Sequence, residues 1–297
     1  MNTSLFDLIR RRPVLLDGAM GTELMARGLG LGVPPELWNE DRPDVVREVH
    51  AAYFAAGSDV VSTNSFGGTP LKLAAHGLEA RAYALNRAAA RLAREAAPPG
   101  RYVAGSMGPT GKFLEPQGPA TVAELTAAYA EQARALAEGG VDVLIVETQY
   151  DLREALAALE GARRVSPLPV FVTMTFSAFP RGYFTIMGDS PAAAAAALEK
   201  AGASAVGANC MLTSEQMAGC IRALKAATTL PVIAQANAGQ PVARPDGTVG
   251  YTQSLEEFVR FVPDIVEGGA RLIGGCCGTT PAYIRAMARA VNRKEEA

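Results

Sequence analysis

The sequence has few aromatic residues, little net charge and only two histidines among 297 residues. Aromatic residues make up 6% of the chain and the formal net charge is −2, which excludes a base-stacking platform or a basic patch for nucleic acid. No apolar run approaches the roughly 18 residues that a membrane helix needs, and residues 1–13 lack the apolar core of a secretory signal. We therefore expect a cytoplasmic protein without nucleic-acid or membrane partners.

Four cysteines are present, Cys210, Cys220, Cys276 and Cys277. In the cytoplasm, cysteines are thiolates or metal ligands more often than disulfide partners, and the adjacent pair would bridge only through a strained ring. Three thiolates around zinc leave the fourth tetrahedral position open, which is the arrangement of a catalytic site. The alternative is that Cys276 and Cys277 are small buried hydrophobic residues at a strand end. We interpret Cys220, in the middle of an expected helix, as a packing residue.

Short apolar runs alternate with longer alanine- and leucine-rich stretches, the pattern of repeated βα units. Eight such units in 297 residues predict an α/β protein with a single (β/α)8 TIM barrel. We expect one domain over residues 1–297, with a charged tail from about residue 293 where a linker would begin. The expected strands are 14–17, 59–63, 102–105, 143–147, 170–175, 205–209, 232–236 and 272–275. The expected helices include 121–138, 152–165, 191–201, 214–227, 255–267 and 281–291.

The active site of such a barrel lies at the C-terminal ends of its strands. The polar and sulfur residues that end the expected strands are Asp17, Thr63, Asn64, Glu147, Cys210, Asn237, Cys276 and Cys277. Because the last three strands are neighbours in a closed barrel, three thiols and an amide should meet on one wall. This placement favours a zinc site over packing cysteines. We interpret His50 and His76, which lie in helical surroundings, as surface or packing residues away from the strand ends.

Two further strand ends allow a functional or a structural interpretation. The turn of Gly18, Ala19 and Met20 exposes backbone amides that would bind a carboxylate, or it is a simple βα turn. Glu147 ends a strongly apolar strand, and its carboxylate either binds an ammonium group or pairs with a cation of the scaffold. We favour a functional role for Glu147, because its strand ends on the active-site face. For the turn by itself, a carboxylate-binding site and a simple βα turn are equally supported.

Together these motifs resemble the homocysteine S-methyltransferase family, and within it the homocysteine-binding barrel of cobalamin-dependent methionine synthase. The resemblance runs from about residue 14 to 291, and its most specific part is the segment GGCCGTTP at 274–281. Supporting motifs occur in the family's order at 17–22, 63–68, 108–111, 147–148, 208–210 and 237–239. The sequence departs from the family at Ala236, where proline is frequent, and at 149–150, where Phe-Ser is more usual. Gly278 resembles the cobalamin-dependent branch, since enzymes that use S-methylmethionine more often carry arginine there.

The resemblance implies a zinc-dependent methyltransferase that binds homocysteine as a zinc thiolate and methylates it to methionine. It makes Cys210, Cys276 and Cys277 the zinc ligands, with Asn237 beside the metal to complete its shell when substrate is absent. It implies that the substrate-binding residues are Asp17 and Glu147 for the ammonium group, the amides of Gly18, Ala19 and Met20 for the carboxylate, and Thr63.

The resemblance leaves the methyl donor open. We expect methylcobalamin or another donor to be supplied by a different domain or protein, because no cobalamin- or folate-binding module is recognisable in the sequence. The alternatives are a free-standing enzyme that uses S-methylmethionine and a barrel joined to a methylenetetrahydrofolate reductase domain. A non-enzyme alternative is a zinc-stabilised barrel that binds an amino acid.

Overall fold

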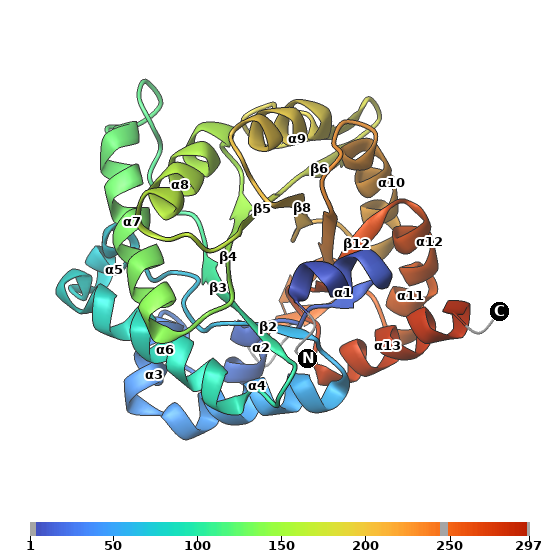
Figure 1. The fold of residues 1–297 in the computed structure, drawn as a ribbon, viewed down its shortest axis with the longest axis horizontal. Helices are drawn as coiled ribbons and strands as arrows, with labels where there is room; N and C mark the ends of the chain where they lie inside the picture. Colours follow the sequence, from blue (N-terminus) through green and yellow to red (C-terminus); the bar gives the residue numbers. More distant parts are fainter. Residues whose placement is uncertain (1–3, 244–248, 296–297) are drawn as a thin grey trace.

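The computed structural model describes residues 4–243 and 249–295, without the side chains of 292–295. Its main sheet has eight parallel strands in the order β1-β12-β9-β8-β5-β4-β3-β2 and curls into a nearly closed barrel surrounded by helices (Figure 1). The eight strands are β1 (Val14–Leu15), β2 (Val60–Ser62), β3 (Tyr102–Met107), β4 (Val143–Gln149), β5 (Val170–Met174), β8 (Ala205–Asn209), β9 (Val232–Ala236) and β12 (Ala270–Gly275). The predicted (β/α)8 barrel is confirmed.

The helices form the outer layer, and several begin at side-chain caps that are visible in the sequence. Thr121 and Thr213 each cap a helix whose third residue, Glu124 or Gln216, bonds back to the cap. The helices are α1 (Leu5–Arg11), α2 (Met20–Ala26), α3 (Trp38–Asp41), α4 (Pro43–Ala56), α5 (Pro70–Leu73), α6 (Ala82–Ala96), α7 (Val122–Gly139), α8 (Leu152–Val165), α9 (Pro191–Lys200), α10 (Ser214–Lys225), α11 (Leu255–Arg260), α12 (Val262–Glu267) and α13 (Pro281–Glu295). Within the described residues no helix is both long and apolar enough to cross a bilayer.

Alternate residues of each strand point into the barrel, where they build an apolar layer. This layer consists of Val14, Leu16, Val60, Ala104, Val143, Ile145, Phe171, Ala205, Ile233 and Leu272. The N-terminal helix α1, which the sequence did not predict, lies across the base of the barrel (Figure 1). Its Leu5 and Ile9 join the same layer, and its Phe6 ring meets Phe171 edge-on at 6.1 Å. The barrel interior is therefore a packed core that is closed from below.

Several element bounds differ from the prediction. The helix expected at 255–267 is two helices, α11 and α12, because Pro263 has no N–H to continue the first one. Between β9 and α11 lies an antiparallel pair that was not predicted, β10 (Pro241–Ala243) and β11 (Val249–Tyr251). A second small hairpin, β6 (Ser177–Phe179) and β7 (Gly182–Phe184), follows β5. Helix α13 continues to Glu295, so residues 293–295 are helical rather than a frayed tail, and 296–297 lie outside the described residues.

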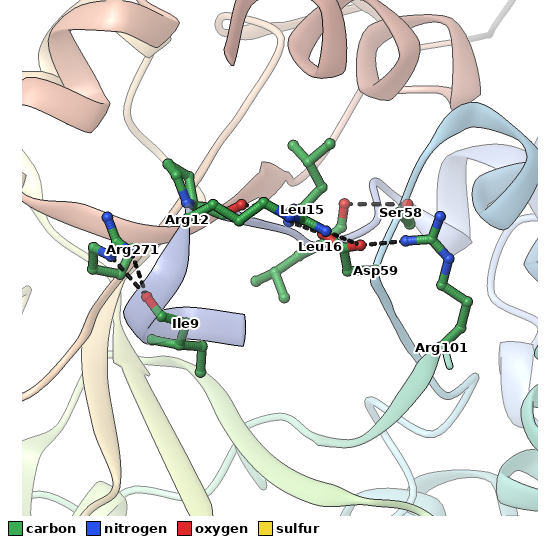
Figure 2. A network of polar contacts seen from close by, with 9 residues as sticks. Ile9, Arg12, Leu15, Leu16, Ser58, Asp59, Arg101 and Arg271 are labelled. Atoms are coloured by element: carbon green, nitrogen blue, oxygen red, sulfur yellow. Dashed lines mark hydrogen bonds and ion pairs between the residues drawn. The ribbon is translucent and has the colours of Figure 1, made fainter. Parts of the chain in front are cut away.

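A buried carboxylate closes the lower part of the seam between the two end strands of the sheet, β1 and β2 (Figure 2). Asp59 accepts hydrogen bonds from both terminal nitrogens of Arg12 at 2.8 Å, from Arg101, and from the Leu15 amide at 3.0 Å. The Asp59 amide in turn donates to the Leu15 carbonyl at 2.7 Å. Because the Asp59 side chain is only 3% exposed, its charge depends on these donors.

Asp59→Asn should lower the free energy of unfolding by about 2 kcal/mol, because it leaves two guanidinium groups facing a neutral amide. This loss is smaller than the loss expected on breaking a fully buried ion pair, because both arginine side chains are about one-third exposed. Urea denaturation measures the change. Glu160→Gln, which removes an exposed i,i+4 pair with Arg164, is the control and should leave the midpoint unchanged. Equal midpoints for Asp59→Asn and wild type would contradict this role.

Candidate active site

A cavity of about 490 Å³ opens at the C-terminal ends of the strands, within the range of about 300–1,000 Å³ that is usual for ligand sites. The structure brings nearly all of the predicted site residues to its wall. They are Asp17, Gly18, Ala19, Met20, Thr63, Glu147, Cys210, Cys276 and Cys277. Asn237 lies just behind this wall, buried beside the cysteines. The predicted convergence of three thiols and an amide is therefore present.

The three sulfur atoms form a compact cluster. The Sγ atoms of Cys210, Cys276 and Cys277 lie within 4.8 Å of one another, and those of Cys210 and Cys277 are 4.0 Å apart. Tetrahedral zinc with bonds of about 2.3 Å places its sulfur ligands about 3.8 Å apart. The cluster therefore fits a zinc ion, and all three side chains remain partly open to the cavity.

Strained backbone holds one side of this cluster. Among the described non-glycine residues, positive φ angles occur at Thr148 (60°), Cys210 (63°) and Met211 (55°). The Asn209 side chain secures this region, since it accepts from the Thr148 amide at 2.8 Å and donates to the Thr148 hydroxyl at 2.6 Å. Such strain is retained where surrounding contacts impose it, commonly at functional sites. Here it turns Cys210 back toward the cysteines that follow β12.

The three thiols perturb one another's pKa. Contacts from Cys276 and Cys277, with smaller effects of the Met211 amide and of Asn237, lower the pKa of Cys210, whereas the contact with Cys210 raises the pKa of Cys276 and of Cys277. A cation at the centre would favour ionisation of all three. The Asn237 Oδ1 atom is buried and has no hydrogen-bond partner among the described residues. This oxygen is therefore available as a metal ligand beside the cluster.

Two carboxyls line the same cavity as the thiols. Asp17 is 1% exposed and accepts from the Ser62 amide at 2.7 Å and from the Ser62 hydroxyl at 3.2 Å. Burial, with a smaller contribution from the charge of Glu147, raises the pKa of Asp17 to about 8. Burial likewise raises the pKa of Glu147 to about 7, although the hydrogen bond that the Ser106 hydroxyl donates to this carboxyl lowers it. Within the described part of the chain neither carboxyl has an ion pair, so a cationic ligand would stabilise both charges.

Thr63 lines the cavity, but its hydroxyl is used within the protein. Ser65 donates its proton to the Ser106 carbonyl at 2.7 Å, so Thr63 is the donor in its 2.6 Å contact with Ser65. Thr63 also accepts from the Ser106 amide at 3.0 Å. Thr63 therefore positions Ser106, which in turn orients Glu147. Neither Ser62 nor Ser106 was predicted from the sequence. Both share the inward-facing parity of their strands, β2 and β3, and this alternation is the signal that indicates them.

In the turn after β1, the backbone amide of Ala19 already makes a hydrogen bond within the protein. Ala19 donates to the Thr279 carbonyl at 3.3 Å, a long bond, and its own carbonyl accepts from the Tyr53 hydroxyl at 3.2 Å. A Cβ at Gly18 would come within 2.7 Å of the Thr279 hydroxyl, so only glycine fits there. These contacts hold the Gly18–Ala19–Met20 turn against the loop that carries Cys276 and Cys277.

Predictions were also made for three residues outside the expected site, His50, His76 and Cys220. His50 is fully buried in α4, as expected for a packing residue, but His76 lines the cavity, so its predicted distance from the strand ends was wrong. The reason is that the chain after β2 folds back over the barrel mouth. Cys220 is buried in the core of α10 and takes no part in the thiol cluster, as predicted.

Comparison with known proteins is consistent with this geometry. A profile of the homocysteine S-methyltransferase family matches residues 14–291. Methionine synthases from Mycobacterium tuberculosis and Mycobacterium leprae are each 36% identical over 98% of the chain. The chain spans about 25% of the length of these curated relatives. The metallated form of the homocysteine methyltransferase MmuM from Escherichia coli is 31% identical and superimposes with a TM-score of 0.78, covering 95% of this chain and 98% of that one.

The raised pKa of Asp17 predicts a pH-dependent cost to folding. Between about pH 4 and 8 the folded state keeps a proton that the unfolded chain has released, so stability falls as the pH rises through this window. Asp17→Asn removes this effect, which amounts to at most about 1.4 kcal/mol per pH unit. Denaturation without substrate at pH 5 and pH 8 should show a smaller loss in the variant than in wild type. Parallel losses would contradict a protonated Asp17.

Proposed function

The chain belongs to the homocysteine S-methyltransferase family and is a methyltransferase, and on this premise we propose that it methylates homocysteine at a zinc ion held by Cys210, Cys276 and Cys277. The observation that carries the proposal is the pairing of three clustered thiols with two carboxyls that lack ion pairs on one cavity wall. The three thiols would hold the zinc ion that activates a sulfur nucleophile, and the two carboxyls would bind an ammonium group. The zinc-stabilised binding barrel without enzymatic activity is thereby set aside.

The three cysteines and Asn237 have different roles at the metal. When bound, zinc would favour the thiolate form of the substrate, and three cysteine ligands keep the site net negative so that the substrate sulfur remains nucleophilic. Cys210, Cys276 and Cys277 would supply three ligand atoms from the cavity wall, and the substrate sulfur would supply the fourth ligand of a tetrahedral zinc ion. Asn237 offers a further ligand in the absence of substrate, its Oδ1 atom, which has no hydrogen-bond partner among the residues that the structure describes. Transfer of a methyl group then requires neither an oxyanion hole nor a histidine base.

The other end of the substrate meets the carboxyl side of the cavity. Asp17 and Glu147 accept hydrogen bonds from the ammonium group, whose positive charge lowers the pKa of both carboxyls and favours their ionised forms. The Gly18 and Met20 amides of the turn after β1 would bind the substrate carboxylate, because the Ala19 amide already donates to the Thr279 carbonyl. Thr63 and Ser106 hold Glu147 in place through the hydrogen bonds described above. Recognition at this end fixes where the substrate sulfur lies relative to the cysteines.

For the methyl donor we propose the methionine synthase type, with methylcobalamin carried by another domain or protein. Gly278 supports this choice: its φ is +81°, and a Cβ there would come within 2.4 Å of the Tyr251 ring. The arginine expected of an enzyme that uses S-methylmethionine does not fit unless Tyr251 moves. Assays of methionine formation with methylcobalamin, methyltetrahydrofolate and S-methylmethionine in turn test this. Activity with S-methylmethionine alone would instead favour a free-standing enzyme like MmuM.

Purified protein should contain about one zinc ion per chain, and Cys277→Ser should lose most of it, because a serine hydroxyl stays protonated and binds zinc weakly. Metal analysis after gel filtration measures this. Cys220→Ser is the matched control, since this thiol lies in the core away from the cluster. Full zinc content in the Cys277→Ser protein would remove this residue from the metal site.

Glu147→Gln should weaken homocysteine binding by roughly 1.5–3 kcal/mol, because it removes a charge-assisted hydrogen bond while keeping the side chain's shape. Zinc content should stay at the wild-type level, which separates a recognition defect from a metal defect. Isothermal titration of the zinc-loaded protein with homocysteine measures the affinity. If Glu147→Gln binds homocysteine as wild type does, this carboxyl belongs to the scaffold.

A further inference from the structure

Above the apolar layer, the barrel interior becomes polar and forms the floor of the cavity. Its inward residues are Asp17, Ser62, Ser106, Glu147, Thr173, Asn209 and Gln235. The other side chains of this layer each make a hydrogen bond to a neighbour in the protein. Gln235 differs from them, because its Oε1 atom is buried and has no partner among the described residues. No role was predicted for this residue from the sequence.

The position of Gln235 in the sheet places this residue at the cavity wall. The side chain is 4% exposed, yet it contributes to the cavity wall. In the sheet it lies between Asn209 of β8 and Gly274 of β12. A Cβ at Gly274 would meet the Gln235 Cγ at 3.3 Å and the Asp17 carbonyl at 2.7 Å, so both flank this glycine. The missing side chain at 274 therefore leaves Gln235 room beside the strand end that carries Asp17.

The Gln235 amide is poorly explained as a packing residue. Its Nε2 atom makes only a long contact of 3.5 Å with the Gly275 carbonyl. A buried amide oxygen without a partner costs free energy, and a methionine of similar size would fill the same space without that cost. Asn209, its neighbour in the same layer, uses both ends of its amide on Thr148 and Thr173. A bound ligand that donates a hydrogen bond would satisfy Gln235.

We propose that the Gln235 carbonyl oxygen accepts one N–H of the substrate ammonium group and so helps to select α-amino thiols. An ammonium group presents three N–H donors. Asp17 and Glu147 are two of the acceptors in the proposed function, on which this inference rests. Gln235 is the third, on the same floor, and it completes the set. It is a specificity-determining residue: it favours homocysteine over a thiol of the same length that lacks the amine.

The test compares two ligands on zinc-loaded protein, homocysteine and 4-mercaptobutanoate, which has the thiol and the carboxylate but no amine. Gln235→Met should weaken homocysteine binding about tenfold and leave 4-mercaptobutanoate binding unchanged. The preference for homocysteine therefore falls about tenfold. Gln235→Glu, which keeps an acceptor oxygen, should retain the preference. Gln117→Met is the control: it makes the same substitution at an exposed residue outside the cavity wall and should leave the binding of both ligands unchanged.

Two outcomes would overturn the role of Gln235 alone. One is an equal loss of both ligands in Gln235→Met, which would indicate packing or metal damage. The other is an unchanged preference in Gln235→Met while Glu147→Gln loses it, which would leave recognition to the carboxyls. A wild-type protein that binds both ligands equally would overturn the proposed recognition of the ammonium group, and this inference with it. Zinc content, measured on every variant, separates these cases.

Discussion

The buried carboxyl of Asp17 ties the closure of the barrel to its chemistry. A sheet of eight parallel strands must join its two end strands, here β1 and β2, to become a barrel. At the base this is done by Asp59, and at the mouth by Asp17, which accepts from the Ser62 amide. Because Asp17 has to lie across the seam, its carboxyl is also held facing the cavity. The position of one chemical group therefore follows from the geometry of closure.

The cavity wall is rich in acidic groups, and this constrains what can bind. Three clustered thiols and two carboxyls line the same cavity. Burial makes each negative charge costly, as the raised pKa values of Asp17 and Glu147 show. Such a site is complementary to two separate positive charges, one at the thiols and one at the carboxyls. A zinc ion and a substrate ammonium group meet this requirement, and the distance between the two sites is set by the barrel.

Much of this site was visible in the sequence because local rules apply to it. Alternating apolar runs and helical stretches predict the barrel, and a barrel brings strand ends together at one rim. Asp17, Glu147 and the three cysteines Cys210, Cys276 and Cys277 lie at or just after the C-terminal ends of strands, so their convergence could be predicted without coordinates. The glycine-rich segment at 274–281 and its companions indicated the family independently.

The sequence by itself thus determined the class of fold, the cysteines that meet, and the family. Tertiary structure decided the rest: helix α1 beneath the barrel, the return of His76 to the cavity, and the partners of the buried polar groups. Ser106 and Glu147 are 41 positions apart, and Ser62 and Asp17 are 45 apart. Whether such residues meet depends on strand register and on which face each side chain takes at the strand's end. Local periodicity carries no information on register between strands, so the free oxygen of Gln235 became apparent only once its neighbours were in place.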